Sequence, residues 1–171
     1  MLVVRAPQPW CPRPLGEWLL RRLLEQSKYF AQYLPIVPLF AVQGSTGTVL
    51  LQHYREDSTP LRCISAAQLA DPKVVQALCH FWRAVESGWR AAGRLPDIGG
   101  RVYTPWELYS PLRTANVVVD TRGNCWLVDV GADTIFHNMQ SPLGRLHGFL
   151  MLRAIRRARR RLECAGEGPR L

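Results

Sequence analysis

The segment Asn116-Val-Val-Val-Asp-Thr-Arg-Gly-Asn-Cys-Trp-Leu-Val-Asp-Val-Gly131 contains two short apolar runs separated by turn-forming residues. The runs cover 117–119 and 125–128, and β-branched runs joined by a glycine-containing turn are typical of a β-hairpin. Asn116 precedes the first strand and Asp129 follows the second, and in an antiparallel hairpin these two ends lie side by side. We therefore expect both side chains on the same side of the hairpin, where an amide oxygen and a carboxylate suit a hard divalent cation such as Mg²⁺.

This segment resembles the catalytic-loop and metal-loop hairpin of the protein-kinase-like superfamily, which includes protein kinases, aminoglycoside phosphotransferases and lipopolysaccharide-core sugar kinases. In protein kinases a catalytic-loop Asn and the Asp of Asp-Phe-Gly hold the Mg²⁺ ions. Asn116 matches the first and Asp129-Val130-Gly131 the second, and their separation of 129 − 116 = 13 residues is the one used in that superfamily. The resemblance implies Mg²⁺ and ATP as ligands, with Asn116 and Asp129 on the metal. An ordinary hairpin that ends in an Asp has the same residue pattern.

The first third of the chain is predicted to contain a strand, a helix and a hairpin, in that order. Residues 1–6 form a short apolar run, and apolar residues recur at helical spacing over 15–33. The β-rich runs 36–43 and 48–54 are joined by Gly-Ser-Thr-Gly, which predicts a second hairpin. This linking segment lacks the G-x-G-x-x-G pattern and is not followed by a helix, so we interpret it as a turn and not as a phosphate loop.

Arg5 and Glu25 match the positions of a charge pair in the resemblance to kinases. In that family a strand Lys is followed by a helix Glu, and the two side chains pair. Here Arg5 ends the first strand, and Glu25, or alternatively Glu17, lies on the following helix. Arg is not equivalent to Lys in this role, because its broad fork differs from a compact ammonium. The alternative is that Arg5 is a surface charge at a strand end and that Glu25 is a solvated helix residue.

The middle of the chain resembles the linker between the two kinase lobes. The resemblance covers 52–57, and it implies that the backbone near Tyr54 faces the adenine of ATP. The pair Asp71 and Pro72 is typical of a helix start, and an apolar stripe predicts that the helix continues to about Ala92.

The catalytic loop is where the kinase pattern fails. The family motif is H-R-D-x-x-x-x-N, in which the Asp accepts the proton of the substrate hydroxyl. Counting back from Asn116 puts that Asp at residue 111, which is a Pro and can accept no proton. The long loop at 94–111 instead offers Asp97, either as a displaced catalytic base or as an ordinary turn-forming residue. Arg113 is a candidate phosphate ligand from the same region.

Ser141 and Pro142 predict the start of a last helix that runs to about Glu163. We expect its apolar face to consist of Leu143, Leu146, Leu150, Ile155, Ala158 and Leu162. The other face is rich in Arg, above all between Arg153 and Arg161. An Arg-rich helix after the metal-loop hairpin is similar in layout to the small lipopolysaccharide-core sugar kinases. An Arg-rich face also suits an anionic partner, either nucleic acid or membrane headgroups.

The composition favours one basic domain with a hydrophobic core. The chain has 171 residues, of which 47% are hydrophobic, a net charge of +9 and a pI of about 10.0. All basic residues except Lys28 and Lys73 are Arg, which suits phosphate-rich partners. The cysteines include no C-x-x-C pair, so we expect reduced thiols, no zinc and no haem. No apolar run approaches the ~18 residues of a membrane span, so we expect a cytoplasmic protein, at most peripheral at the inner face of the membrane.

Together these patterns predict an α+β domain with a minimal protein-kinase-like fold. Residues 1–54 are expected to form a partial N-terminal lobe and 55–163 a mainly helical C-terminal lobe that contains the catalytic and metal-loop hairpin, with a flexible tail at 164–171. We expect no segment before Leu2 to supply the glycine-rich loop. Because Pro111 also replaces the base, the sequence favours a pseudokinase or regulatory protein that can retain binding of Mg²⁺ and nucleotide. The alternatives are an active small-molecule, sugar or lipid phosphotransferase, and a basic module that binds nucleic acid or an anionic membrane.

Overall fold

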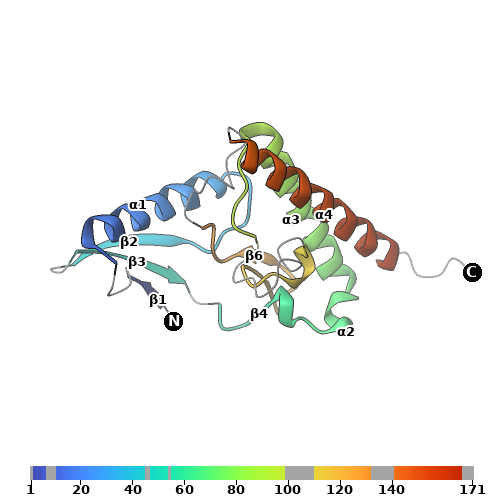
Figure 1. Cartoon of the computed structure of the whole chain (residues 1–171). Helices are drawn as coiled ribbons and strands as arrows, with labels where there is room; N and C mark the ends of the chain where they lie inside the picture. The colour runs from blue at the N-terminus through green and yellow to red at the C-terminus, as the bar shows by residue number, and fades with distance from the viewer. Residues whose placement is uncertain are drawn as a thin grey trace, which may run out of the picture.

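The computed structural model describes residues 2–6, 11–44, 47–53, 55–98, 110–131 and 141–166. Within these ranges the protein is α+β, with two antiparallel three-stranded sheets and four α-helices, so the expected fold class is confirmed at this level. Figure 1 shows two parts side by side. The first sheet and helix α1 (Arg13–Phe30) form the left part, and the second sheet with α3 (Pro72–Ala92) and α4 (Pro142–Gly166) forms the right part.

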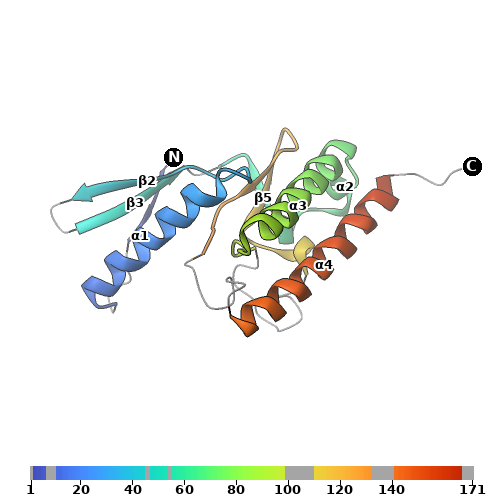
Figure 2. The ribbon, with the colours of Figure 1, turned by 90° about the horizontal axis from the view of Figure 1, so that it is seen from above.

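The left part contains the predicted strand, helix and hairpin. Its strands are β1 (Leu2–Arg5), β2 (Leu39–Gly44) and β3 (Gly47–His53), in the spatial order β1-β3-β2. Helix α1 packs along this sheet, as Figure 2 shows from above. The helix begins two residues earlier than predicted, because Pro14 is tolerated in its first turn, and it ends at Phe30, where a turn replaces the predicted last residues.

The right part contains the hairpin predicted from the opening segment. Strands β4 (Ser58–Pro60), β5 (Val117–Asp120) and β6 (Cys125–Leu127) form a sheet in the order β4-β5-β6. The short helices η1 (Leu61–Cys63) and α2 (Ala66–Leu69) follow β4, and η3 (Pro111–Arg113) precedes β5. All residues of β5 are buried, because the strand lies between β4 and β6 and against the core.

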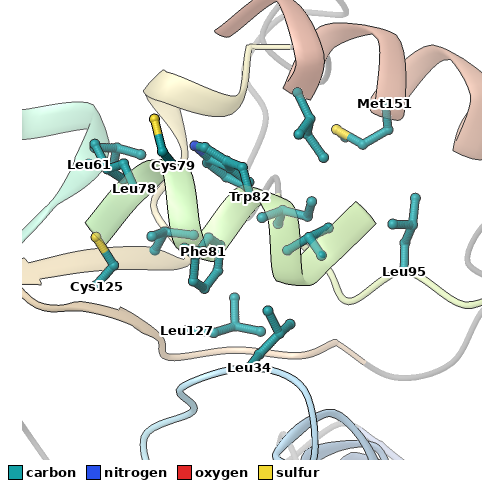
Figure 3. Packing of buried hydrophobic residues seen from close by; sticks show 14 of the residues in the cluster. Leu34, Leu61, Leu78, Cys79, Phe81, Trp82, Leu95, Cys125, Leu127 and Met151 are labelled. Carbon is teal, nitrogen blue, oxygen red and sulfur yellow. The ribbon is translucent and has the colours of Figure 1, made fainter. Parts of the chain in front are cut away.

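Helix α3 is the central element of the hydrophobic core. Its first turn is capped as predicted, with Asp71 Oδ1 accepting a hydrogen bond from Lys73 N at 2.8 Å. The predicted stripe is buried and consists of Val74, Val75, Leu78, Phe81, Trp82, Val85 and Trp89. Figure 3 shows Phe81 and Trp82 of this stripe, with Leu127 of β6 on one side of α3 and Met151 of α4 on the other. The helix therefore joins the hairpin to the last helix through apolar contacts.

Helix α4 buries the second half of the face that we predicted, with Ile155, Ala158 and Leu162, but not the first half. Its buried apolar residues are Met151, Leu152, Ile155, Ala158 and Leu162, whereas Leu143 and Leu146 are 52% and 56% exposed. Gly148 lies against Trp89 of α3, so closely that a Cβ there would overlap the indole ring. This close approach of the two helices sets the rotation of α4 and turns the apolar residues of its first half outward. The helix also extends through the first residues of the predicted tail, to Gly166.

A buried carboxylate, Glu86, links α3 to α4. Its side chain accepts hydrogen bonds from Arg156 Nε at 2.7 Å, from Arg90 Nη2 at 2.8 Å and from Arg159 Nη1 at 3.3 Å. Burial alone would raise the pKa of Glu86, but the hydrogen bond from Arg156 and the three positive charges outweigh it and lower that pKa below its ordinary value. Arg156 and Arg159 therefore reach across to α3, although the side chain of Arg156 stays 45% exposed and that of Arg159 25% exposed.

Candidate functional site

The two parts of the molecule meet where β6 ends. Leu127 N donates to Pro35 O at 2.8 Å, and Leu127 O accepts from Val37 N at 2.9 Å. The side chain of Gln52 in β3 donates from Nε2 to Val128 O at 2.6 Å. These hydrogen bonds hold the exit of the hairpin against the first sheet, so the residues that follow β6 have defined neighbours from both parts.

Asn116 lies opposite Val128, one position away from the pairing with Asp129 that we expected. The hydrogen bond from Val128 N to Asn116 O, at 2.8 Å, continues the register of β5 and β6. The side chain of Asn116 donates from Nδ2 to Asp97 O at 2.8 Å, and no described residue donates to its Oδ1. The amide oxygen is thus directed away from the Asp97 carbonyl, and it is free of hydrogen bonds within the described part of the chain.

Both carboxylate oxygens of Asp129 accept hydrogen bonds. Oδ1 accepts from Gly131 N at 3.0 Å, and Oδ2 lies 2.8 Å from Arg5 Nη1. Arg5 also donates to Gln52 Oε1 at 2.9 Å and to Val128 O at 3.1 Å. The side chains of Arg5 and Asp129 are 27% and 33% exposed, so the ion pair lies at the edge of the solvent and not in the core. Arg5 therefore binds the predicted metal ligand.

The pairing of Arg5 with Glu25 or Glu17, which the kinase resemblance implied, is not formed among the described residues. Glu25 Oε2 lies 3.2 Å from Arg22 Nη1 on the same helix, and the Glu25 side chain is 52% exposed. Glu17, the other candidate, lies 3.4 Å from Arg13 Nε. Both glutamates form exposed pairs within α1, because the helix directs these side chains toward solvent. The alternative interpretation of Glu25, as a solvated helix residue, is the one that agrees with the structure.

Asp97 lies next to the segment that follows β6. Its N–H donates to Val130 O at 2.9 Å, and its carbonyl accepts the hydrogen bond from Asn116. A Cβ built on Gly131 would lie only 2.6 Å from Asp97 Cβ, and the φ of Gly131 is +69°. Gly131 thus allows both the turn after Asp129 and the close approach of Asp97. The structure brings the candidate base and the candidate metal ligands into one neighbourhood.

Two side chains of this neighbourhood are the candidate ligands for a magnesium ion. Asn116 and Asp129 offer an amide oxygen and a carboxylate, which are donors that Mg²⁺ prefers. The described part of the chain gathers no cluster of three or more His, Cys, Asp or Glu side chains for a metal ion. Magnesium requires none, since it is bound through one or two carboxylates together with water and substrate phosphates. Joint binding of one ion by Asn116 and Asp129 stays a prediction.

The cavity beside the Arg5–Asp129 pair is very small. It is lined by Arg5, Leu23, Ser27, Ile36, Leu39, Gln52, Val128, Asp129 and Val130, and its volume is about 10 Å³. Pockets for small molecules occupy ~300–1,000 Å³, so this cavity has no room for a nucleotide. Any nucleotide at Asp129 would have to approach the carboxylate from another side. Tyr54, which the kinase resemblance assigns to the adenine site, lies outside the described residues.

Pro111 and Arg113 belong to η3, on the side of the molecule that faces α4. Pro111 is buried. Because its side chain is a hydrocarbon ring, the expected position of the base has no proton acceptor. Arg113 is exposed and lines a groove of about 620 Å³ together with Arg153, Arg157 and Arg161 of α4. Arg113 is not among the residues that line the cavity beside Arg5. The structure thus groups this predicted phosphate ligand with the arginines of α4.

The buried thiols are not candidate nucleophiles. Burial raises the pKa of the Cys125 thiol to about 12, with smaller contributions from Asp120 and Cys79. Burial also raises the pKa of Cys79, and the charge of Glu163 adds to the effect. Both cysteines are buried in the core, and because the thiolate is the reactive form, a raised pKa makes them poor nucleophiles.

Gln52 is the residue of this site that the sequence analysis missed. It is 6% exposed and connects Arg5 on β1 to the Val128 carbonyl after β6. In the sequence, only the position of this polar amide, directly after two leucines in a predicted strand, indicates that Gln52 is buried. Comparison of the sequence with protein-family models and with curated proteins found no match. The site is thus defined by the residues and their contacts alone.

Proposed function

We propose that the protein is a catalytically weak kinase-like domain, of a pseudokinase or regulatory type, that binds Mg²⁺ and nucleotide phosphates at the exit of hairpin β5–β6. The contact between Arg5 and Asp129, at 2.8 Å, carries this proposal. The kinase resemblance assigned one of them as the strand cation and the other as the metal-binding Asp, from segments far apart in the sequence. Their contact places the candidate phosphate-binding cation next to the candidate metal ligand.

The order of elements also supports the proposal. The chain begins with a strand that ends in Arg5, followed by a helix and a hairpin. A mainly helical part comes next, in which the hairpin β5–β6 follows the long helix α3. This is the order that the resemblance implies for a partial N-terminal lobe and a C-terminal lobe. The hydrogen bonds of Leu127 and Gln52 connect these two parts at the proposed site.

Each residue has a distinct part in the proposed site. Asn116 and Asp129 would hold Mg²⁺, which supplies positive charge that neutralises the nucleotide phosphates. Arg5 would add a second positive charge from the opposite sheet. Asp97, adjacent to Gly131, is our candidate for the catalytic base. Such a base takes the proton of an acceptor hydroxyl.

Two features argue for weak catalysis. Pro111 occupies the position of the base in the kinase motif, and general base catalysis contributes a factor of ~10²–10⁴ to rates. Arg5 already occupies one oxygen of Asp129, so a metal ion has to share that carboxylate with a guanidinium. Both features lower the expected turnover while leaving a binding site for metal and phosphate.

The test is a binding titration on the whole chain. Thermal unfolding and calorimetry are measured with Mg²⁺ alone, with ATP plus a chelator, and with both ligands. We expect the largest stabilisation with both, because the ion and the phosphates share Asp129. Asp129→Asn should abolish the magnesium-dependent part. Asp57→Asn, at an exposed carboxylate whose side chain has no ion pair in the described part of the chain, is the matched control and should behave like the wild type.

Two results would contradict the proposal. Absence of any magnesium-dependent nucleotide binding in the wild type would remove the kinase-like function. Turnover of ATP in the ordinary kinase range of ~1–100 per second, with a sugar, lipid or protein acceptor, would instead identify an active phosphotransferase. The position of Asp97 beside Gly131 is the observation that keeps this second function as an alternative.

A further inference from the structure

The outward face of α4 has two halves of different chemistry. Its first half exposes Leu143, Leu146 and Phe149, whose exposed fractions are 52%, 56% and 61%. These positions follow one another at spacings of three, so they lie along the same side of the helix. Large apolar side chains grouped in this way mark an interaction surface more often than an isolated exposed leucine does.

The second half of the same face carries arginines with no acidic partner in the described part of the chain. These are Arg153, Arg157, Arg160 and Arg161, all of which are exposed. Arg156 and Arg159, by contrast, are hydrogen-bonded to Glu86, and Arg159 also lies near Glu163. Like charges at helical spacings of three and four repel each other, so this group is unfavourable unless negative charge lies opposite it.

Grooves flank the arginine row on both sides. One groove, of about 650 Å³, has Trp89, Phe149 and Leu152 among its lining residues, together with five arginines of α4. The other, of about 620 Å³, is lined by Arg113, by three arginines of α4 and by apolar residues of η3 and α4. Arg153 and Arg157 line both grooves. Guanidinium groups above an apolar floor suit ligands that combine a phosphate with a hydrocarbon part.

We propose that α4 binds the surface of a membrane that contains anionic phospholipids. Leu143, Leu146 and Phe149 enter the region between headgroups and acyl chains, and the arginine row binds the lipid phosphates. A helix that contributes apolar anchors and basic residues on one accessible face is typical of binding in the plane of the interface. Among the described residues, no helix has the length and apolar content of a membrane span.

The apolar half of the face favours a membrane over nucleic acid. Phosphate contacts alone would explain the arginines, but they would leave three large apolar side chains exposed beside the charged backbone of a polynucleotide. An interfacial helix uses both halves at once. The buried face of α4 stays on α3 in this arrangement, because only side chains that already face outward enter the lipid.

The test is binding of the whole chain to lipid vesicles by co-sedimentation. Vesicles of phosphatidylcholine alone are compared with vesicles that also contain phosphatidylglycerol. We expect binding to the anionic vesicles that weakens with added salt. Each Arg→Gln change at Arg157 or Arg161 should weaken it by roughly fivefold, the effect of one basic residue near an anionic surface. Arg21→Gln and Arg62→Gln, at exposed arginines outside α4, are the matched controls and should change nothing.

The double variant Leu146→Ser, Phe149→Ser separates the two candidate partners. We expect it to lose vesicle binding by roughly tenfold or more, from the apolar area that no longer enters the lipid. Its helical circular dichroism should be unchanged, because both side chains already face solvent.

The proposal is overturned if the protein does not bind anionic vesicles, or if binding depends on the arginines but not on Leu146 and Phe149. Tight binding of a duplex or single-stranded nucleic acid, unaffected by the double variant, would assign the arginine row to nucleic acid. The metal site is independent of this surface, so magnesium binding should persist in all these variants.

Discussion

Asp129 Oδ2 lies 2.8 Å from Arg5 Nη1, although 124 positions separate the two residues in the chain. The guanidinium therefore occupies one oxygen of the carboxylate that the hairpin pattern assigns to a metal ion. Because both side chains are partly exposed, the pair can open without exposing the core. Binding of a cation at Asp129 and the contact with Arg5 should compete.

Arg5→Gln should raise the affinity of the protein for Mg²⁺. The change removes the competing positive charge, and a partly exposed ion pair contributes ~1 kcal/mol or less, so we expect an increase of up to roughly fivefold. Calorimetric titration with Mg²⁺ measures this effect. The same variant should unfold with a free energy lower by about 1 kcal/mol, because Gln52 and Val128 also lose a donor. A loss of metal binding would show instead that Arg5 orients Asp129 for the ion.

Asp97→Asn should reduce any residual phosphotransfer while leaving metal binding intact. An amide keeps the shape of the side chain but cannot accept a proton, so a loss of ~10²-fold or more in rate is expected if Asp97 is the base. The backbone hydrogen bonds of Asp97 to Val130 and Asn116 do not involve the altered atoms. ATP consumption with magnesium and a set of acceptors gives the rate, and calorimetry gives the affinity. An unchanged rate would return Asp97 to the role of a turn residue.

Gly131→Ala should destabilise the protein and displace Asp97. The φ of Gly131 is +69°, and the new Cβ would lie 2.6 Å from Asp97 Cβ, so both strain and overlap are introduced. We expect a loss of ~1–3 kcal/mol in the free energy of unfolding, measured with a chemical denaturant. Gly44→Ala is a suitable control, since a Cβ there would meet no described atom closer than 3.4 Å. Equal stability losses in both variants would contradict this role of Gly131.

Asp120→Asn should cost about 2 kcal/mol of stability at neutral pH. Burial alone would raise the pKa of Asp120, but hydrogen bonds from Trp126, Asn124 and Arg122 outweigh it and lower that pKa from 3.8 to about 2. Its Oδ2 also lies 2.9 Å from Arg55 Nη2. A lowered folded-state pKa gives stability that is present above pH 3.8 and is lost as the pH falls toward about 2. Denaturation curves at several pH values should therefore show the variant and the wild type converging in acid.

Glu86→Gln should destabilise the packing of α3 against α4. Arg90, Arg156 and Arg159 lose the charge that neutralises them, and we expect a cost of about 2 kcal/mol, below that of a fully buried pair because the arginines are partly exposed. The pKa of Glu86 is lowered, so its contribution to stability is present above the ordinary value of 4.5 and is lost at lower pH. Glu25→Gln, in an exposed pair with Arg22, is the matched control and should lie within ~0.5 kcal/mol of the wild type.

The local elements of the fold were predictable from the sequence. The hairpin β5–β6, the cap of α3 at Asp71 and the buried stripe of that helix depend on turn residues, side-chain capping and apolar periodicity. These signals act within one or two turns of the chain, so the sequence contains them completely. The neighbourhood of Asn116, Asp129 and Asp97 was predictable in part, because all three flank the same hairpin or the loop before it.

The tertiary structure alone decided which partners the long charged side chains have and which face of α4 is buried. Arg5 contacts Asp129 and not Glu25, because Gln52 and Val128 hold the exit of β6 beside the end of β1. Gly148 lets α4 approach Trp89, and this contact turns Leu143 and Leu146 outward. Apolar periodicity indicates that a helix has a buried face. Which residues face the core, and which carboxylate an arginine contacts, depend on segments that are distant in the chain.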